Sequence, residues 1–551
     1  MQKKTIILLP LLIAISIAVG ILVGNMLKQN AGPVYSGMTF NHPGKITTIL
    51  DLIKRGYVDS VNTDDIVEKT IPDILKNLDP HTVYIPVKEM QEVQEEMQGN
   101  FSGIGVQFSI QEDTVRVIEV ISGGPSSKVG ILPGDRIVSV NDSVIAGMGV
   151  QNQTVMNLLR GQKNSKVDVG ILRKGYSDVL DFEITRGDIP IYSVDVSYMI
   201  DPETGFIKIS RFANTTYSEF MEGMNQLQVK GAKKVIIDLR GNPGGSLVGV
   251  IQMVDEFLQK GEPILYTEGV NQPRKTYNAS AHTSFGDIAV YVLIDEFSAS
   301  ASEIFAGAMQ DNDRGIVIGR RSFGKGLVQE QIPLTDGSAL RLTVARFYTP
   351  SGRCIQSSYK DGNEEYYNHI YERFHNMEQL VADSIHFIDS LKYTTKGGRI
   401  VYGGGGIMPD FFVPVDTTGN SKYFEKLLGK GLIYTYAYLY TDEHRDALSA
   451  LTTADELESY LDKEDVMGDF LKYAEQKGVR KDRAGLKESG AWIETQLKAY
   501  IARNIIGEEG FYPIIKHVDK TLLRAIEISR ENLLVQNVVP ADSIANTTVV
   551  E

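Results

Sequence analysis

Two stretches rich in aliphatic residues, each leading through small residues into a helical pattern, constrain the fold of this chain most. They are residues 235–239 and 288–294, and helical spacing follows at 247–258 and 302–309. A short, continuous apolar run is typical of a strand that is covered on both faces. Strands that alternate with helices in this way predict an α/β core, which we place at residues 188–414.

A β-rich module is expected before this core, at residues 99–187. Dense turn signals, such as Pro133-Gly-Asp135, separate short apolar segments there, and helical spacing appears only at 155–159. The expected strands are 103–108, 115–120, 136–140 and 167–172.

Helical regions flank these two parts, so the fold class expected for the whole chain is α/β, as a mixed α+β protein of several domains. Apolar residues at helical spacing predict short helices over 44–98, and similar spacing recurs over 415–551. A polar segment with Gly and Pro at 25–43 is expected to be a linker. We expect the C-terminal helices to pack against the core or another subunit.

The first 24 residues predict a signal-anchor transmembrane helix. Lys3 and Lys4 precede an uncharged run at 5–23, whose length is close to the roughly 20 residues that cross a bilayer. The lysines predict a cytoplasmic N-terminus and export of the rest of the chain. A cleaved signal peptide is the alternative, although its apolar stretch is usually only about 7–15 residues long.

The composition excludes several classes of function. The 551 residues carry a formal net charge of −14 and no long basic run, which argues against a nucleic-acid partner. The single cysteine, Cys354, excludes an intramolecular disulfide and a cysteine-built metal site, and we expect a packed thiol there. No metal or other cofactor is expected.

A serine at the corner between the strand at 288–294 and the helix at 302–309 is a candidate nucleophile. Ser300 lies in a run of small residues, where its hydroxyl would face solvent beside the first N–H groups of the helix. A structural alternative stays open, because Ser300 and Glu303 also fit a capping box.

The base for Ser300 is expected to be a lysine, because none of the eight histidines lies in a motif typical of a histidine-dependent protease. His81, in an Asp-Pro-His turn, is the best placed of them and fits a structural role. Lys325 lies between Gly324 and Gly326 and before an apolar strand, which would bury its amine and favour the neutral form. A phosphate-binding loop is the alternative, but the glycine spacing and the missing Ser or Thr argue against it.

The turn after the strand at 235–239 is the third candidate element. Its sequence Gly-Asn-Pro-Gly-Gly at 241–245 leads into a helix, where exposed N–H groups collect. A donor for an oxyanion fits there, and an ordinary strand-to-helix turn is the alternative.

These motifs together resemble the carboxyl-terminal processing peptidases, the tail-specific serine proteases. The resemblance rests on Ser-Ala-Ser-Ala-Ser-Glu at 298–303, Gly-Lys-Gly-Leu-Val-Gln at 324–329 and Asp-Leu-Arg-Gly-Asn-Pro-Gly-Gly at 238–245. Further matches follow the order of the family over residues 45–414. They are Leu-Asp-Pro-His-Thr-Val-Tyr at 78–84, Phe-Ser-Gly-Ile-Gly-Val at 101–106, Leu-Pro-Gly-Asp-Arg-Ile at 132–137, Ala-Arg-Phe-Tyr-Thr-Pro-Ser-Gly-Arg at 345–353 and Gly-Ile-Met-Pro-Asp at 406–410.

The resemblance implies a catalytic role for three residues. Ser300 would be the nucleophile, Lys325 its general base, and Gln329 the residue that orients the lysine. No functional position of the family motif is substituted in this sequence.

The resemblance also implies an oxyanion hole. The N–H of Ala301 would be one donor, and Gly244 or Gly245 would supply the other. The flanking Ser298 and Ser302 would shape the turn and take no part in the reaction.

Residues 99–187 resemble the PDZ domain of the same family, which implies a groove for a peptide. The N–H groups of Gly103, Ile104, Gly105 and Val106 would hold the terminal carboxylate, and the peptide would add as a strand. The helix near 154–159 would form the other wall and select apolar C-terminal residues. A β-module without a ligand is the alternative.

The sequence therefore predicts a serine endopeptidase of the bacterial cell envelope that cuts proteins near their C-terminal tails. The catalytic part would lie in the periplasm, anchored in the inner membrane, or be secreted if the N-terminal segment is cleaved. The expected partners are polypeptides with apolar C-termini, the membrane, and a second subunit or an adaptor at the C-terminal helices. Two alternatives remain open, namely an exported PDZ scaffold without catalysis and an ester hydrolase on the same core.

Overall fold

The computed structural model describes residues 44–531 except 112, 122 and 382–388. The predicted signal anchor at 1–24 and the predicted linker at 25–43 lie outside the described residues. No helix among the described residues is long and apolar enough to cross a membrane. The chain divides into two compact units, Met1–Ile71 and Pro72–Glu551.

The described part of the first unit is helical, in agreement with the spacing of its apolar residues. Helix α2 (Lys45–Gly56) contains no buried residue. Helix α3 (Thr63–Leu75) also contains none, and it continues across the boundary between the units. A third predicted helix, α4 (Val87–Gln98), belongs to the second unit and is capped by Gly99, which adopts a left-handed conformation.

The β-rich module is an antiparallel sheet with strand order β3-β4-β5-β7-β8, and β6 pairs with β5. Its inward-facing residues, such as Val115, Val117 and Ile137, form a separate apolar core. The elements are β3 (Val106–Gln111), β4 (Thr114–Val120), α5 (Pro125–Val129), β5 (Arg136–Val140), β6 (Ser143–Val144), α6 (Asn152–Leu159), β7 (Lys166–Leu172) and β8 (Leu180–Thr185).

The prediction of a single strand at 103–108 is wrong, because two strands, β2 and β3, meet this segment and are separated by residues 104–105. Strand β2 (Asn100–Gly103) pairs with β9 (Gly187–Pro190), whereas β3 begins only at Val106. Gly105 between them has φ +76°, a left-handed conformation that interrupts an extended strand. The β2–β9 pair brings the entry and the exit of the module side by side.

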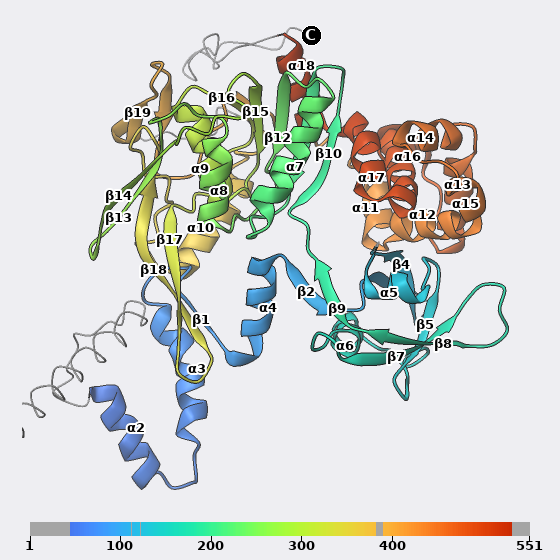
Figure 1. The fold of residues 1–551 in the computed structure, drawn as a ribbon, viewed down its shortest axis with the longest axis horizontal. Coiled ribbons are helices and arrows are strands. Elements are labelled where there is room, and N and C mark those ends of the chain that lie inside the picture. The colour runs from blue at the N-terminus through green and yellow to red at the C-terminus, as the bar shows by residue number, and fades with distance from the viewer. Residues whose placement is uncertain (1–43, 112, 122, 382–388, 532–551) are drawn as a thin grey trace, which may run out of the picture. The chain divides into compact units, whose positions relative to one another are not determined.

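The predicted α/β core contains a six-stranded sheet of order β10-β11-β12-β15-β16-β21, parallel except for the edge strand β10. Figure 1 shows α7 and α8 lying along its strands. The elements are β10 (Val194–Met199), β11 (Thr204–Ile209), α7 (Thr216–Val229), β12 (Lys234–Asp238), α8 (Leu247–Asp255), β15 (Ala289–Ile294), α9 (Ala301–Asp311), β16 (Gly315–Gly319) and β21 (Phe411–Phe412).

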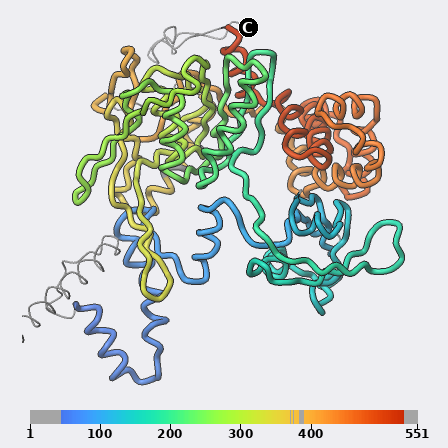
Figure 2. Tube along the Cα trace, viewed as in Figure 1, coloured from blue at the N-terminus to red at the C-terminus, as the bar shows by residue number. Residues whose placement is uncertain are grey.

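Successive residues of β12 face opposite layers, which confirms that the apolar runs are covered on both sides. Val235 and Ile237 belong to one apolar cluster with residues of α7, α8 and α9. Ile236 belongs to a second cluster with residues of α18 (Lys520–Arg530). Helix α18, red in Figure 2, therefore covers the core sheet although it lies in the C-terminal region of the sequence.

A second sheet supports the segment that contains Lys325. Its order is β1-β18-β13-β14, and β17 pairs with β18. The strands are β1 (Val83–Ile85), β13 (Pro263–Gly269), β14 (Gln272–Asn278), β17 (Leu327–Pro333) and β18 (Ala339–Tyr348), followed by α10 (Asn363–His375), η2 (Asp389–Leu391), β19 (Lys392–Thr394) and β20 (Ile400–Tyr402).

Residues 422–518 form a helical group with its own apolar core. Its elements are α11 (Lys422–Gly429), α12 (Leu432–Glu443), α13 (Arg445–Leu448), α14 (Ala454–Leu461), α15 (Val466–Gln476), α16 (Arg483–Ile506), α17 (Glu508–Ile515) and η3 (Lys516–Val518).

Candidate active site

The residues predicted for catalysis surround one cavity of about 860 Å³. Apolar side chains, including Phe212, Leu247 and Phe347, form much of its wall. The predicted site residues that line it are Ser300, Ala301, Lys325, Gln329, Gly244 and Gly245.

Ser300 occupies a strained corner between β15 and α9. Its φ of 54° and ψ of −110° are unusual for a residue with a side chain, and such a conformation costs about 1–3 kcal/mol. A strained turn from a strand into a helix is typical of an exposed serine nucleophile. Glu303 also completes the capping box with Ser300, so the capping geometry and the strained corner occur together.

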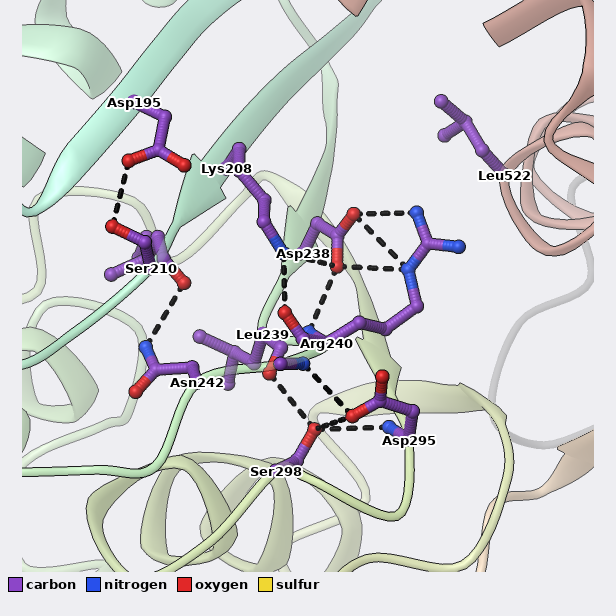
Figure 3. A network of polar contacts seen from close by, with 12 residues as sticks. Asp195, Lys208, Ser210, Asp238, Leu239, Arg240, Asn242, Asp295, Ser298 and Leu522 are labelled. Atoms are coloured by element: carbon purple, nitrogen blue, oxygen red, sulfur yellow. Dashed lines mark hydrogen bonds and ion pairs between the residues drawn. The ribbon is translucent and has the colours of Figure 1, made fainter. Parts of the chain in front are cut away.

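Two serines beside Ser300 join its turn to the segment at 239–242, which leads into the glycine-rich loop. Ser298 Oγ donates to the Leu239 carbonyl at 2.8 Å, a bond visible in Figure 3. Ser302 Oγ donates to the Asn242 carbonyl at 2.9 Å. Both serines are fully buried, which fits a role in shaping the turn.

The two glycines of this loop differ in their hydrogen bonds. The Gly244 N–H donates to Asn242 Oδ1 at 2.9 Å. Within the described residues, the N–H groups of Gly245 and Ala301 donate to no other group. Of the two glycines, Gly245 is therefore the one whose N–H is available at the cavity beside Ser300.

Lys325 lies in an environment that favours a neutral amine. Burial lowers the pKa of Lys325, and the nearby Arg341 lowers it further, against the opposing effect of Glu303. Within the described part of the chain, the Lys325 Nζ makes no hydrogen bond or ion pair. In particular, no hydrogen bond joins Lys325 Nζ to Ser300 Oγ. Catalytic hydrogen bonds in ligand-free sites are often long and shorten when a substrate binds.

Glu303 connects the nucleophile turn with the segment that contains Lys325. Its side chain is fully buried, and burial raises its pKa. Oε2 accepts the N–H groups of Ser300 and Lys325, each at 2.8 Å. Oε1 accepts Ser322 Oγ at 2.6 Å and the Gly324 N–H at 2.7 Å. The capping motif marked Glu303 in the sequence, but the contacts to Ser322, Gly324 and Lys325 could not be read from local spacing.

Gln329 lines the cavity, but the structure does not bring its amide to Lys325. Its Nε2 donates to the carbonyl of His81. On β17, Gln329 is opposite Thr343 of β18, whose Oγ1 donates to Asp79 Oδ1 at 3.0 Å. This bond holds the turn at 79–82 beside Gln329, which explains why the amide meets His81.

His81 is half-buried among aromatic rings, in agreement with the structural role expected for it. Its Nε2 lies 3.1 Å from the Tyr366 hydroxyl, and the two rings make an edge contact. Burial, together with the positive charge of Lys325, lowers the pKa of His81 to about 4. The imidazole is therefore neutral at neutral pH.

The four residues expected to bind a peptide terminus lie between β2 and β3. Gly103 ends β2, Val106 begins β3, and the Ile104 side chain is buried in the core of the module. The carbonyls of Ile104 and Gly105 accept the N–H groups of Ser126 and Ile121. Helix α6 contributes Val155 and Leu159 to the same apolar core.

Comparison with known proteins places these elements in described families. The model of peptidase family S41 matches residues 203–363, and the PDZ domain model matches residues 102–184. A family of unknown function, DUF8443, matches residues 423–507.

Two curated relatives agree with the match to the peptidase family. The chain is 34% identical over 323 residues to the carboxy-terminal-processing protease of Bartonella bacilliformis, which is 58% of this chain and 73% of that protein. It is 34% identical over 314 residues to the carboxy-terminal processing protease CtpB of Bacillus subtilis, or 56% and 65% of the two chains. A solved photosystem II D1 C-terminal processing protease is 25% identical, covers 55% of this chain and 88% of its own, and has a TM-score of 0.31.

Proposed function

The chain belongs to the carboxy-terminal-processing proteases of peptidase family S41 and is a serine-type peptidase with a PDZ domain, and we propose that Ser300 is its nucleophile and Lys325 its general base. The observation that supports this proposal most is the shared cavity, which Ser300, Lys325 and both glycines of the 241–245 loop line. The lowered pKa of Lys325 agrees with it, because a base must be neutral to accept a proton.

In the proposed reaction, the Lys325 amine removes the proton from Ser300 Oγ as this oxygen attacks the carbonyl carbon of the scissile peptide bond. The N–H groups of Ala301 and Gly245 stabilise the resulting oxyanion. The Lys325 ammonium then gives its proton to the departing amine, and an acyl-enzyme remains on Ser300. A water molecule, activated by the same lysine, hydrolyses this ester and releases the new C-terminus.

The PDZ module is proposed to select the substrate. A polypeptide with an apolar C-terminus would add as a strand beside β3, with its carboxylate at the N–H groups of residues 103–106. The cleavage site would then lie near the tail of the bound protein. The match of residues 102–184 to the PDZ domain model supports this proposal.

The location in the cell envelope is a separate proposal, which rests on the uncharged run at 5–23 after Lys3 and Lys4. The protein should sediment with membranes, resist extraction by high salt and dissolve in detergent. A protease added to spheroplasts should digest the catalytic part. Recovery in the soluble fraction at the mass of the full chain would contradict the anchor.

A further subunit or an adaptor at the C-terminal helices also stays a prediction. Sedimentation equilibrium of the detergent-solubilised protein would test it. A single species at 61.0 kDa over the whole concentration range would contradict self-association.

The catalytic proposal is tested with an unfolded polypeptide that ends in apolar residues, supplied as the free acid and as the C-terminal amide. The parent protein should cleave the free acid faster, and Ser300→Ala and Lys325→Ala should both be inactive. Lys396→Ala serves as the control, because Lys396 is an exposed lysine paired with Glu262 at 2.7 Å. Cleavage by Ser300→Ala at the parent rate would refute the assignment.

The same experiment separates the two alternatives from the proposal. A parent protein that binds the tail but never cleaves it would indicate a scaffold. A parent that hydrolyses short esters and ignores the peptide C-terminus would indicate an ester hydrolase.

A further inference from the structure

Arg240 lies directly before the loop that presents the Gly245 N–H, and two carboxylates hold its guanidinium. Nε donates to Asp238 Oδ1 at 3.0 Å, and Nη2 donates to Asp238 Oδ2 at 2.6 Å. Nη1 and Nη2 donate to Asp519 at 2.8 and 2.6 Å. Figure 3 shows Arg240 facing Asp238, with Leu522 of α18 nearby.

The two carboxylates restrain Arg240 in different ways. Asp238 belongs to the same strand end and lies only two residues away, so its bond to Arg240 is local. Asp519 lies 279 residues away in the sequence and caps α18, since its Oδ1 accepts the Leu522 N–H at 3.0 Å. Asp519 therefore ties the start of the loop to a helix that packs against the sheet through Leu522.

The charges in this cluster balance. Lys208 Nζ lies 3.3 Å from Asp238 Oδ1 and also donates to the Arg240 carbonyl. The two cations, Lys208 and Arg240, therefore face two carboxylates, those of Asp238 and Asp519. The two cations hold the pKa of Asp238 below its usual range although burial opposes this. An ion pair taken out of water adds little net stability, whereas the paired bonds between a guanidinium and a carboxylate impose a defined geometry.

The first two residues of the loop, which follow Arg240 directly, are bonded to the nucleophile turn. The Gly241 N–H donates to Asp295 Oδ1 at 2.9 Å, and the Asn242 carbonyl accepts the Ala299 N–H at 3.0 Å. Because Gly241 adjoins Arg240, movement of Arg240 would disturb these two bonds, and we infer that the loop would then shift the Gly245 N–H relative to Ser300.

We propose that Asp519 is a positioning residue for the oxyanion-binding loop, and that α18 is thereby part of the catalytic apparatus. This inference rests on the function proposed above. Asp519 lies outside the segments that match the peptidase model, 203–363, and the DUF8443 model, 423–507.

The test is Asp519→Asn in the full chain, because asparagine keeps an oxygen that can cap α18 and removes the charge that holds Arg240. Loss of one oxyanion donor costs about 10²–10³-fold in kcat, so a displaced donor should cost about 10-fold. We expect kcat to fall about 10-fold, with KM within about 2-fold of the parent value. Asp519→Glu, which retains the carboxylate, should recover at least a third of the parent kcat.

Glu527→Gln is the matched control, since Glu527 lies on α18 and pairs with Arg524 at 3.0 Å on the exposed side. It should leave kcat and KM unchanged. If Asp519→Asn does not fold, Arg240→Lys tests the same bond, because lysine keeps the charge and loses the paired geometry. It should lower kcat in the same way.

Two results would overturn the inference. One is a kcat for Asp519→Asn within 2-fold of the parent value. The other is a loss of kcat that only follows the loss of folded protein, measured by near-UV circular dichroism on the same sample. Cleavage that survives Ser300→Ala would instead refute the proposed function, so the two failures can be told apart.

Discussion

Replacement of Glu303 by glutamine tests the central connection of the site. The carboxylate accepts four donors, two on each oxygen, and each donor belongs to the nucleophile turn or to the segment around Lys325. Glutamine has nearly the same shape but only one acceptor oxygen. In either orientation of the amide, its NH₂ group must face two of the former donors.

The two orientations differ in free energy. If NH₂ replaces Oε2, the N–H groups of Ser300 and Lys325 both lose their acceptor. If it replaces Oε1, the Gly324 N–H loses its acceptor, and the Ser322 hydroxyl, which already accepts the Ile407 N–H at 2.6 Å, must also turn. A buried donor without a partner costs about 1–3 kcal/mol. The preferred orientation should therefore destabilise the protein by about 2–4 kcal/mol.

Urea unfolding and steady-state peptide cleavage measure both consequences of Glu303→Gln. We expect the loss of about 2–4 kcal/mol together with at least a 10-fold lower kcat, because either orientation of the amide breaks bonds that fix the segment around Lys325 relative to the nucleophile turn. Glu296→Gln is the control, since Glu296 is also buried and pairs with Arg320 at 2.7 Å. A Glu303→Gln protein that keeps the parent kcat and loses less than about 0.5 kcal/mol would refute this reasoning.

Three further predictions follow from the site. Burial lowers the pKa of Lys325. We therefore expect kcat/KM to rise with pH and to reach its plateau below the pH at which an exposed lysine titrates. Activity that is lost as pH rises through this range would contradict a lysine base. Gly245→Ala should abolish peptide cleavage, because φ of Gly245 is +144° and a Cβ there would lie 2.0 Å from the Phe212 carbonyl oxygen. A Gly245→Ala variant with the parent kcat would contradict the assigned loop conformation. The pKa of His81 is about 4 in the folded protein, against 6.5 for an ordinary histidine. Between these two pH values the unfolded chain therefore binds a proton at His81 that the folded protein does not. Urea unfolding should therefore show a stability contribution that is complete above pH 6.5 and falls by about 3 kcal/mol towards pH 4, and His81→Asn should remove this part of the pH dependence.

Much of the core was predictable because its signals are local. The apolar runs at 235–239 and 288–294 identify β12 and β15, and the small residues after them identify the turns. Parallel neighbours end at the same edge of a sheet, so motifs that follow these strands converge. This geometry accounts for the presence of Ser300 and Gly245 at one cavity.

The contacts that depend on distant segments were not predictable from spacing. Gln329 was expected at Lys325, but the β17–β18 register places it beside the turn of His81. Asp519 meets Arg240 only because α18 returns to the core sheet. No local pattern in either segment encodes the identity of such a partner.

The division of the β-module was missed for a different reason. Residues 103–108 have the composition of one strand, and only the left-handed conformation of Gly105 separates β2 from β3. A glycine within an apolar segment permits such a conformation without requiring it.

Covalent labelling with a fluorophosphonate, followed by peptide mass mapping, tests the proposed catalytic pair most directly. The account predicts a single adduct on Ser300, a labelling rate that rises with pH to a plateau, and at least a 100-fold lower rate in Lys325→Ala. An adduct on a different residue, or an unchanged labelling rate in Lys325→Ala, would contradict the assignment of Ser300 and Lys325.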